Sequence, residues 1–75
     1  MSHDQYCVII VYSTSHAMRI ETLLQEKGIA CKMIPVPRQI SSDCGVCVRI
    51  LRSDVKAARQ VIKEAHVEIE GVHDI

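Results

Sequence analysis

The chain has 75 residues, which is enough for one domain spanning residues 1–75. Nine Lys and Arg balance nine Asp and Glu, and this zero net charge argues against nucleic acid or an anionic membrane as the main partner. Tyr6 and Tyr12 are the only aromatic residues, so a base-stacking platform is not expected either.

The first predicted element is a strand over residues 5–12, which is apolar on both of its alternating faces. Such a strand is typical of the centre of a sheet, with both faces covered by the chain or by a partner. Its apolar run is too short to cross a bilayer. No basic segment followed by a longer apolar run marks a signal peptide, so we expect a cytoplasmic protein.

A helix is predicted next, with Ser13, Thr14 and Ser15 as candidate N-cap residues. It runs to about Lys27, and Gly28 is expected to end it as the C′ residue. The expected buried stripe has three- and four-residue spacing and consists of Ala17, Ile20, Leu23, Leu24 and the stem of Lys27.

Residues 29–36 form the second predicted strand, and Pro35 and Pro37 at its end predict an edge position. Residues 38–45 are a polar connection that leads into a third strand, Val46–Leu51. A second helix is predicted after Ser53 as its N-cap, and residues 67–75 as a fourth strand with a bulge at Gly71. The second helix is expected to bury Val55, Ala58, Val61, Ile62 and Ala65.

The predicted order βαββαβ indicates an α+β fold of the ferredoxin-like type: a four-stranded antiparallel sheet with two helices on one face. In this arrangement the third strand lies antiparallel to the first. We therefore expect the 38–45 connection and the start of the first helix to meet at one end of the sheet.

Cys44 and Cys47 form a C-x-x-C pair in this connection, whereas Cys7 and Cys31 lie in apolar runs and are expected to be packed. Without a secretion signal, all of these cysteines are expected to be reduced. A helix N-terminus near Cys44 would lower the pKa of its thiol and favour the thiolate. Cys44 is therefore the candidate nucleophile, and Cys47 is either packed or a resolving thiol.

Several groups near this thiol are candidates for holding an anion or a persulfide. Gly45 would let a partner approach closely, and serine hydroxyls and helix N–H groups would donate hydrogen bonds. Three of these groups also have a structural alternative: the serines as a turn that bonds its own backbone, Arg38 as a solvated charge, and His16 as a bystander. The candidate binding residues are Gly45, Ser41, Ser42, Arg38, Thr14, Ser15 and His16.

The stretch Pro37-Arg38-Gln39-Ile40-Ser41-Ser42-Asp43-Cys44-Gly45 resembles the signature of the selenium/sulfur carrier-like protein family. Residues 13–17 with Glu21, and residues 69–72, are also similar to that family. The resemblance implies a protein that carries sulfane sulfur or selenium on Cys44. It also implies a donor protein, such as a cysteine desulfurase, and an acceptor enzyme.

Three functions remain open from the sequence. The first is a small thiol carrier that forms a Cys44 persulfide or perselenide and needs no other cofactor. The second is a binding module without chemistry, regulatory or homodimeric through its open sheet face. The third is a redox protein that uses a Cys44–Cys47 disulfide. The sequence has no second C-x-x-C and no close His pair, so a metal site is not predicted. It also has no recognisable set of catalytic residues that would indicate a free-standing enzyme.

Overall fold

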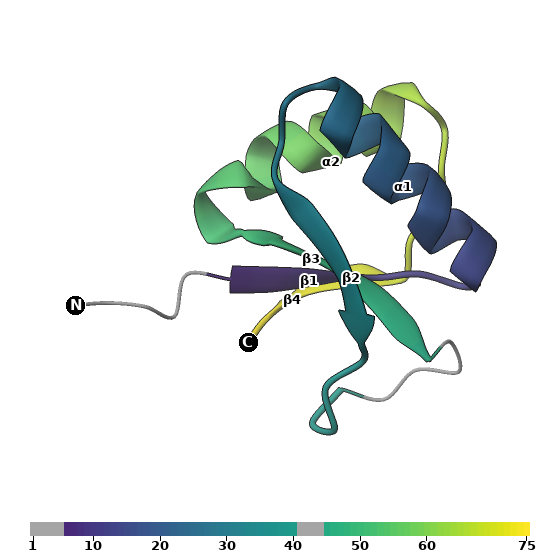
Figure 1. The fold of residues 1–75 in the computed structure, drawn as a ribbon, viewed down its shortest axis with the longest axis vertical. Coiled ribbons are helices and arrows are strands. Elements are labelled where there is room, and N and C mark those ends of the chain that lie inside the picture. Colours follow the sequence, from purple (N-terminus) through teal and green to yellow (C-terminus); the bar gives the residue numbers. More distant parts are fainter. Residues whose placement is uncertain (1–5, 41–44) are drawn as a thin grey trace.

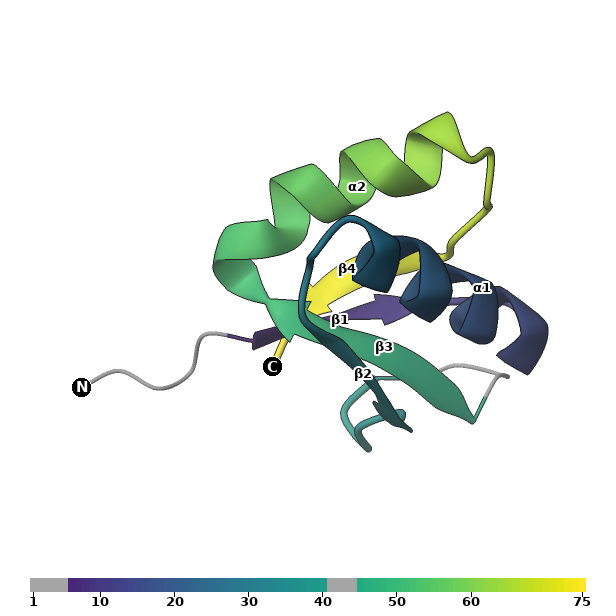
Figure 2. The same cartoon turned by 45° about the horizontal axis from the view of Figure 1, so that its top comes forward.

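The computed structural model describes residues 6–40 and 45–75. Two helices lie side by side over one face of a four-stranded sheet (Figures 1 and 2). The elements are β1 (Tyr6–Ile10), α1 (Thr14–Glu26), β2 (Cys31–Pro35), β3 (Val46–Leu51), a 3₁₀ turn (Arg52–Asp54), α2 (Val55–Glu64) and β4 (Gly71–Asp74).

The strand order is β2-β3-β1-β4, and every neighbouring pair is antiparallel. The expected α+β class, the antiparallel four-stranded sheet and the two helices are confirmed. β1 lies inside the sheet and β2 at its edge, as the apolar run and the prolines predicted. The β1–β3 register pairs Tyr6 with Leu51 at one end and Ile10 with Cys47 at the other.

The core lies on both faces of the sheet. Alternate β1 side chains, Cys7 and Ile9, point toward the helices, while Val8 and Ile10 point to the opposite face. Buried residues from both helices complete the larger cluster, and the smaller one lies on the face away from the helices. The larger cluster is Cys7, Ile9, Val11, Ala17, Ile20, Leu24, Ile29, Val48, Ile50, Ala58 and Ile62.

Both ends of α1 follow from the sequence. Ser13 is the N-cap, and its hydroxyl oxygen accepts a hydrogen bond from the backbone N–H of His16 at 3.3 Å. Gly28 has φ +75°, a left-handed conformation that disfavours other residues, and it ends the helix as expected. The observed helix buries Ala17, Ile20 and Leu24. Leu23 is only half-buried and Lys27 is exposed.

The fourth strand is shorter than predicted, because residues 67–69 connect the helix layer to the sheet (Figure 2). The chain reaches β1 at Glu70, whose N–H donates a hydrogen bond to the carbonyl oxygen of Ile10 at 2.7 Å. His66 has φ 59° and turns the chain at the end of α2. Val67 and Ile69 pack against the helix-facing core, which explains why their alternation resembled that of a strand. The strand then begins at Gly71.

The start of α2 also differs from the prediction. The 3₁₀ turn precedes α2, so the N-cap position falls on Asp54 and not on Ser53, and no side-chain hydrogen bond caps the helix. The expected buried face of α2 is present: Ala58 and Ile62 are buried, and Val55 and Val61 are partly buried against the core.

Candidate functional site

One end of the sheet brings together the segments that the sequence linked to chemistry. At this end β1 finishes, β3 begins and β2 finishes, because Cys47 is paired with both Ile10 and Ile34. Gly45 lies directly before β3, and its carbonyl accepts a hydrogen bond from the N–H of Val36 at 3.1 Å. The β1–α1 connection leaves the sheet from the same end (Figure 1).

The α1 N-terminus presents a polar, accessible surface. Thr14 and Ser15 are exposed in the first turn, and His16 is half-buried. The Ser13 hydroxyl oxygen lies 2.7 Å from Nδ1 of His16, and the two atoms form a hydrogen bond whose donor is set by the tautomer of His16. No acidic residue occupies the first turn of the helix. The positive end of the helix dipole is therefore not neutralised by a carboxylate of that turn.

Arg38 and Gly45 stand at the two described ends of the connection. Arg38 is exposed in a turn that the N–H of Ile40 closes by bonding the carbonyl of Pro37 at 3.0 Å. Gly45 is also exposed, and a Cβ built on it would meet nothing within 4 Å. Three expected site residues, Ser41, Ser42 and Cys44, lie outside the described residues, so their roles stay predictions.

Cys47 is fully buried on the sheet face away from the helices. It is 0% exposed and packs with Val8 and Ile10, and its Sγ lies 3.9 Å from the carbonyl oxygen of Pro35. Packing, one of its two expected roles, is therefore observed. A resolving role would require Cys47 to become accessible, and it stays a prediction.

The sheet face opposite the helices is covered in part by the chain itself. Ile34, Val36, Ile40 and Ile75 pack against Val8, Ile10 and Cys47. All three of those residues are at most 1% exposed. Dimerisation through this face stays a prediction, and the apolar surface that it could use is the end of the face near Tyr6 and Leu51.

The two described cysteines outside the C-x-x-C pair have suppressed reactivity. The pKa of the Cys7 thiol is raised, first by burial and then by Asp74. The Asp74 carboxylate accepts a hydrogen bond from Cys7 Sγ at 3.0 Å, and its negative charge also disfavours the thiolate. Burial, followed by the charge of Glu21, raises the pKa of Cys31. Both thiols therefore favour the protonated form, which is a poor nucleophile.

The raised pKa of Cys7 predicts a loss of stability in mild alkali. The folded state holds the Cys7 proton above the ordinary thiol value of 9.0, whereas the unfolded state releases it. The free energy of unfolding should therefore fall as pH rises through that range, with a limiting slope of about 1.4 kcal/mol per pH unit. Urea unfolding between about pH 8 and pH 10.5 measures this slope. Cys7→Ala should make the slope shallower and leave the part that Cys31 contributes, because the pKa of Cys31 is raised too. An unchanged slope in that variant would contradict the assignment.

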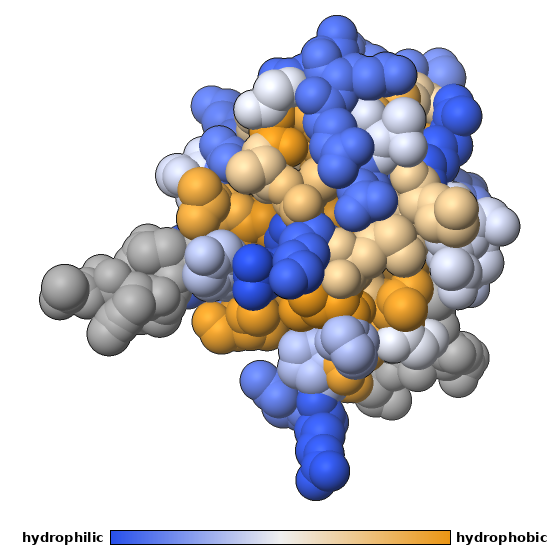
Figure 3. Space-filling view, in the orientation of Figure 1, coloured by the Kyte–Doolittle hydropathy of each residue, from blue (hydrophilic) through white to orange (hydrophobic). Residues whose placement is uncertain are grey.

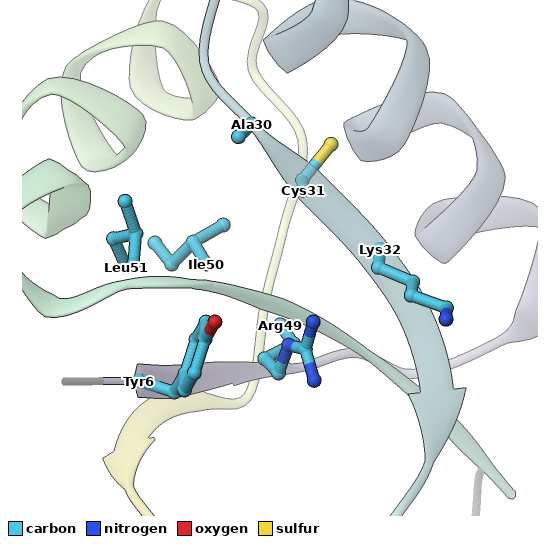
Figure 4. A pocket seen from close by; sticks show the side chains of 7 residues that line it. All are labelled: Tyr6, Ala30, Cys31, Lys32, Arg49, Ile50 and Leu51. Carbon is cyan, nitrogen blue, oxygen red and sulfur yellow. The ribbon is translucent and has the colours of Figure 1, made fainter. Parts of the chain in front are cut away.

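Sequence reasoning missed a hollow at the other end of the sheet, where β2 and β3 diverge (Figure 4). It has a volume of ≈ 310 Å³, and the Arg49 guanidinium lies 4.3 Å from the centre of the Tyr6 ring beside it. Only the strand register, which brings Lys32 opposite Arg49, reveals this grouping. The lining residues are Tyr6, Ala30, Cys31, Lys32, Arg49, Ile50 and Leu51.

Across residues 6–40 and 45–75, no group of three or more His, Cys, Asp or Glu side chains is placed to hold a metal ion. Within the same ranges, none of the helices has the length and apolar character needed to span a membrane.

Comparison with protein families gives a match over residues 6–74, to the family described as "Putative Se/S carrier protein-like". No curated protein and no solved structure matches the chain. The match covers every described helix and strand as well as the Cys44 segment. The resemblance found in the sequence is thereby confirmed, and the chain belongs to the Se/S carrier protein-like family.

Proposed function

We propose that this chain is a small carrier protein that accepts sulfane sulfur or selenium on Cys44 and passes it to an acceptor enzyme. The observation that carries the proposal is the family match over residues 6–74. The strand order and the placement of the helices support a ferredoxin-like arrangement as its scaffold. Its proposed setting is the reducing cytoplasm, where the thiols stay available.

The chemical step is an exchange between thiolates. The Cys44 thiolate attacks the terminal sulfur of a persulfide on a donor protein, such as a cysteine desulfurase. The bond between the donor's two sulfurs breaks, and the donor cysteine leaves as a thiolate. Cys44 then carries the transferred sulfur as a persulfide anion, and an acceptor thiolate removes it in the same way. No net oxidation occurs, and selenium follows the same steps as a perselenide.

The described surroundings of Cys44 support this chemistry. Gly45 is exposed, and a Cβ built on it would meet nothing within 4 Å, so the chain leaves room for a donor at Gly45. The α1 N-terminus lies at the same end of the sheet, and its N–H groups and exposed Thr14 and Ser15 hydroxyls suit a bound anion. In this proposal Arg38 supplies a cationic group and His16 acts as a proton carrier.

Burial of Cys47 favours a mechanism with one thiol over one with two. To release the cargo by itself, Cys47 would have to attack Cys44 Sγ, form a disulfide and expel hydrosulfide. The side chain that must do so is 0% exposed beneath Val36 and Ile40. We therefore assign release to the acceptor enzyme.

Site-resolved alkylation tests whether Cys44 is built to hold a thiolate. Iodoacetamide is applied to the native chain over a range of pH, and peptide mass spectrometry follows each cysteine separately. We expect the Cys44 rate to rise with a midpoint below about 8.5. Cys7 and Cys31 serve as internal controls, because burial raises the pKa of both. A Cys44 that reacts no faster than Cys31 would count against the carrier and favour a binding module.

A further inference from the structure

The hollow where β2 and β3 diverge has features that the proposed carrier chemistry does not use. It lies at the Tyr6–Leu51 end of the β1–β3 pair, whereas Gly45 lies beyond the Ile10–Cys47 end. A strand rises about 3.3 Å per residue, so the length of β3 keeps the two places roughly 16 Å apart. A ligand in the hollow would therefore lie far from Gly45.

Two cationic residues occupy directly opposite strand positions at this hollow. Lys32 on β2 is directly opposite Arg49 on β3, and both face away from the helices, because their neighbours two residues along, Ile34 and Cys47, belong to the cluster on that face. Like charges at directly opposite positions destabilise a sheet. The one ion pair within the described ranges joins Arg52 and Asp74, so no described carboxylate neutralises Lys32 or Arg49.

Arg49 is held in position by Tyr6. The guanidinium carbon lies 4.3 Å from the ring centre, and the two side chains stand side by side in Figure 4. A cation–π contact occupies the flat face of the guanidinium, while its N–H donors lie in the plane and remain directed outward. This geometry favours recognition of an oxyanion by hydrogen bonds.

The remaining wall of the hollow is apolar. Ala30, Ile50 and Leu51 line it together with Cys31, whose Sγ points toward α1 and contacts the carbonyl oxygen of Glu21 at 3.6 Å. Figure 3 shows apolar surface gathered around β2 and bordered by hydrophilic side chains. The volume of ≈ 310 Å³ lies at the lower limit for small-molecule sites. At the ~30 Å³ that one water occupies in the liquid, it suits a molecule of about ten non-hydrogen atoms or fewer.

We propose that this hollow binds a small organic anion: a short branched apolar body with one carboxylate or phosphate group. The oxyanion bridges Lys32 and Arg49 and relieves their repulsion. The apolar body lies against the exposed side chains of Ala30 and Leu51. A hollow with two neighbouring cationic residues suits a small anion better than it suits the flat surface of a partner protein. Because the net charge of the chain is zero, the attraction of an anion to this hollow comes from these two residues.

Titration of the full chain with isovalerate tests the site, using amide proton–nitrogen spectra at constant ionic strength. We expect saturable shifts confined to residues 30–32, 49–51 and Tyr6, with weak affinity in the millimolar range because the ligand has few atoms. Isovaleramide, which has the same shape without the charge, should not bind, and inorganic phosphate should bind more weakly.

Two variants and a control locate the interaction. Lys32→Gln and Arg49→Gln should each raise the dissociation constant of isovalerate about tenfold, since each removes one charged hydrogen bond. Arg59→Gln on the exposed side of α2 should leave it unchanged. Equal binding of isovaleramide or phosphate, or unchanged affinity in Lys32→Gln, would overturn the proposal. Absence of saturable shifts would also overturn it, and would leave the two cations as a surface for an acidic segment of a partner protein.

Discussion

Cys44→Ser is expected to abolish sulfur loading while leaving the fold intact. The wild-type chain, incubated with a cysteine desulfurase and cysteine, should gain the mass of one sulfur atom, and the peptide carrying the gain should contain Cys44. A serine hydroxyl is not ionised at neutral pH and does not attack a persulfide, so the variant should show no such gain. Intact-protein mass spectrometry before and after treatment with a reducing agent measures the difference.

Cys31→Ser is the matched control for this experiment. It removes a described thiol whose pKa is raised by burial, and it should load like the wild type. Cys47→Ala separates the mechanisms with one and two thiols, since a carrier that relies on its acceptor should load and transfer sulfur without Cys47. A sulfur-dependent mass gain that persists in Cys44→Ser, or is lost in Cys31→Ser, would contradict the assignment of Cys44.

The elements that were predictable from the sequence are those whose signals are local. The hydroxyl of Ser13 and the glycine at position 28 limit α1 because capping and positive φ depend on single residues. Pro35 predicts an edge position for β2 because a proline cannot donate to a strand ladder on both sides. The doubly apolar β1 predicts a central strand because neither of its faces can be left in water.

The elements that were predicted wrongly depend on tertiary contacts. Residues 67–69 alternate like a strand, yet they cross between two layers, and Val67 and Ile69 pack against the helix side of the core. Ser53 has a good capping side chain, but a 3₁₀ turn moves the start of α2 to Val55. In both places the local pattern did not determine the path of the backbone.

The candidate site was predictable as a location but not as a set of contacts. Antiparallel pairing of the first and third strands follows from the element order, and it places Gly45 and the start of α1 at one end of the sheet. The burial of Cys47 beneath Val36 and Ile40 could not be predicted, because it depends on how the connection returns across the sheet. The pairing of Lys32 with Arg49 likewise requires the exact register of two strands.

Ile9→Ala is expected to cause the largest loss of stability. Ile9 is 0% exposed in the central strand, paired with Val48 on one side and Val72 on the other, beneath both helices. Truncating such a side chain costs about 2–5 kcal/mol, through lost burial and the cavity left behind. A domain of this length has a total stability of about 4–11 kcal/mol, so the variant should lose a large share of it and, at the low end of that range, unfold substantially.

Urea unfolding followed by circular dichroism measures this effect. Met18→Ala is the control, because Met18 is 57% exposed on α1 and its truncation should change stability by no more than about 0.5 kcal/mol. A loss below about 1 kcal/mol for Ile9→Ala would contradict the packing of β1 beneath the helices. The consequence extends to the candidate site, because β1 leads directly to Ser13 and the α1 N-terminus. If that terminus helps to hold the persulfide, Ile9→Ala should lose sulfur loading in proportion to its unfolded fraction, while Met18→Ala should load normally.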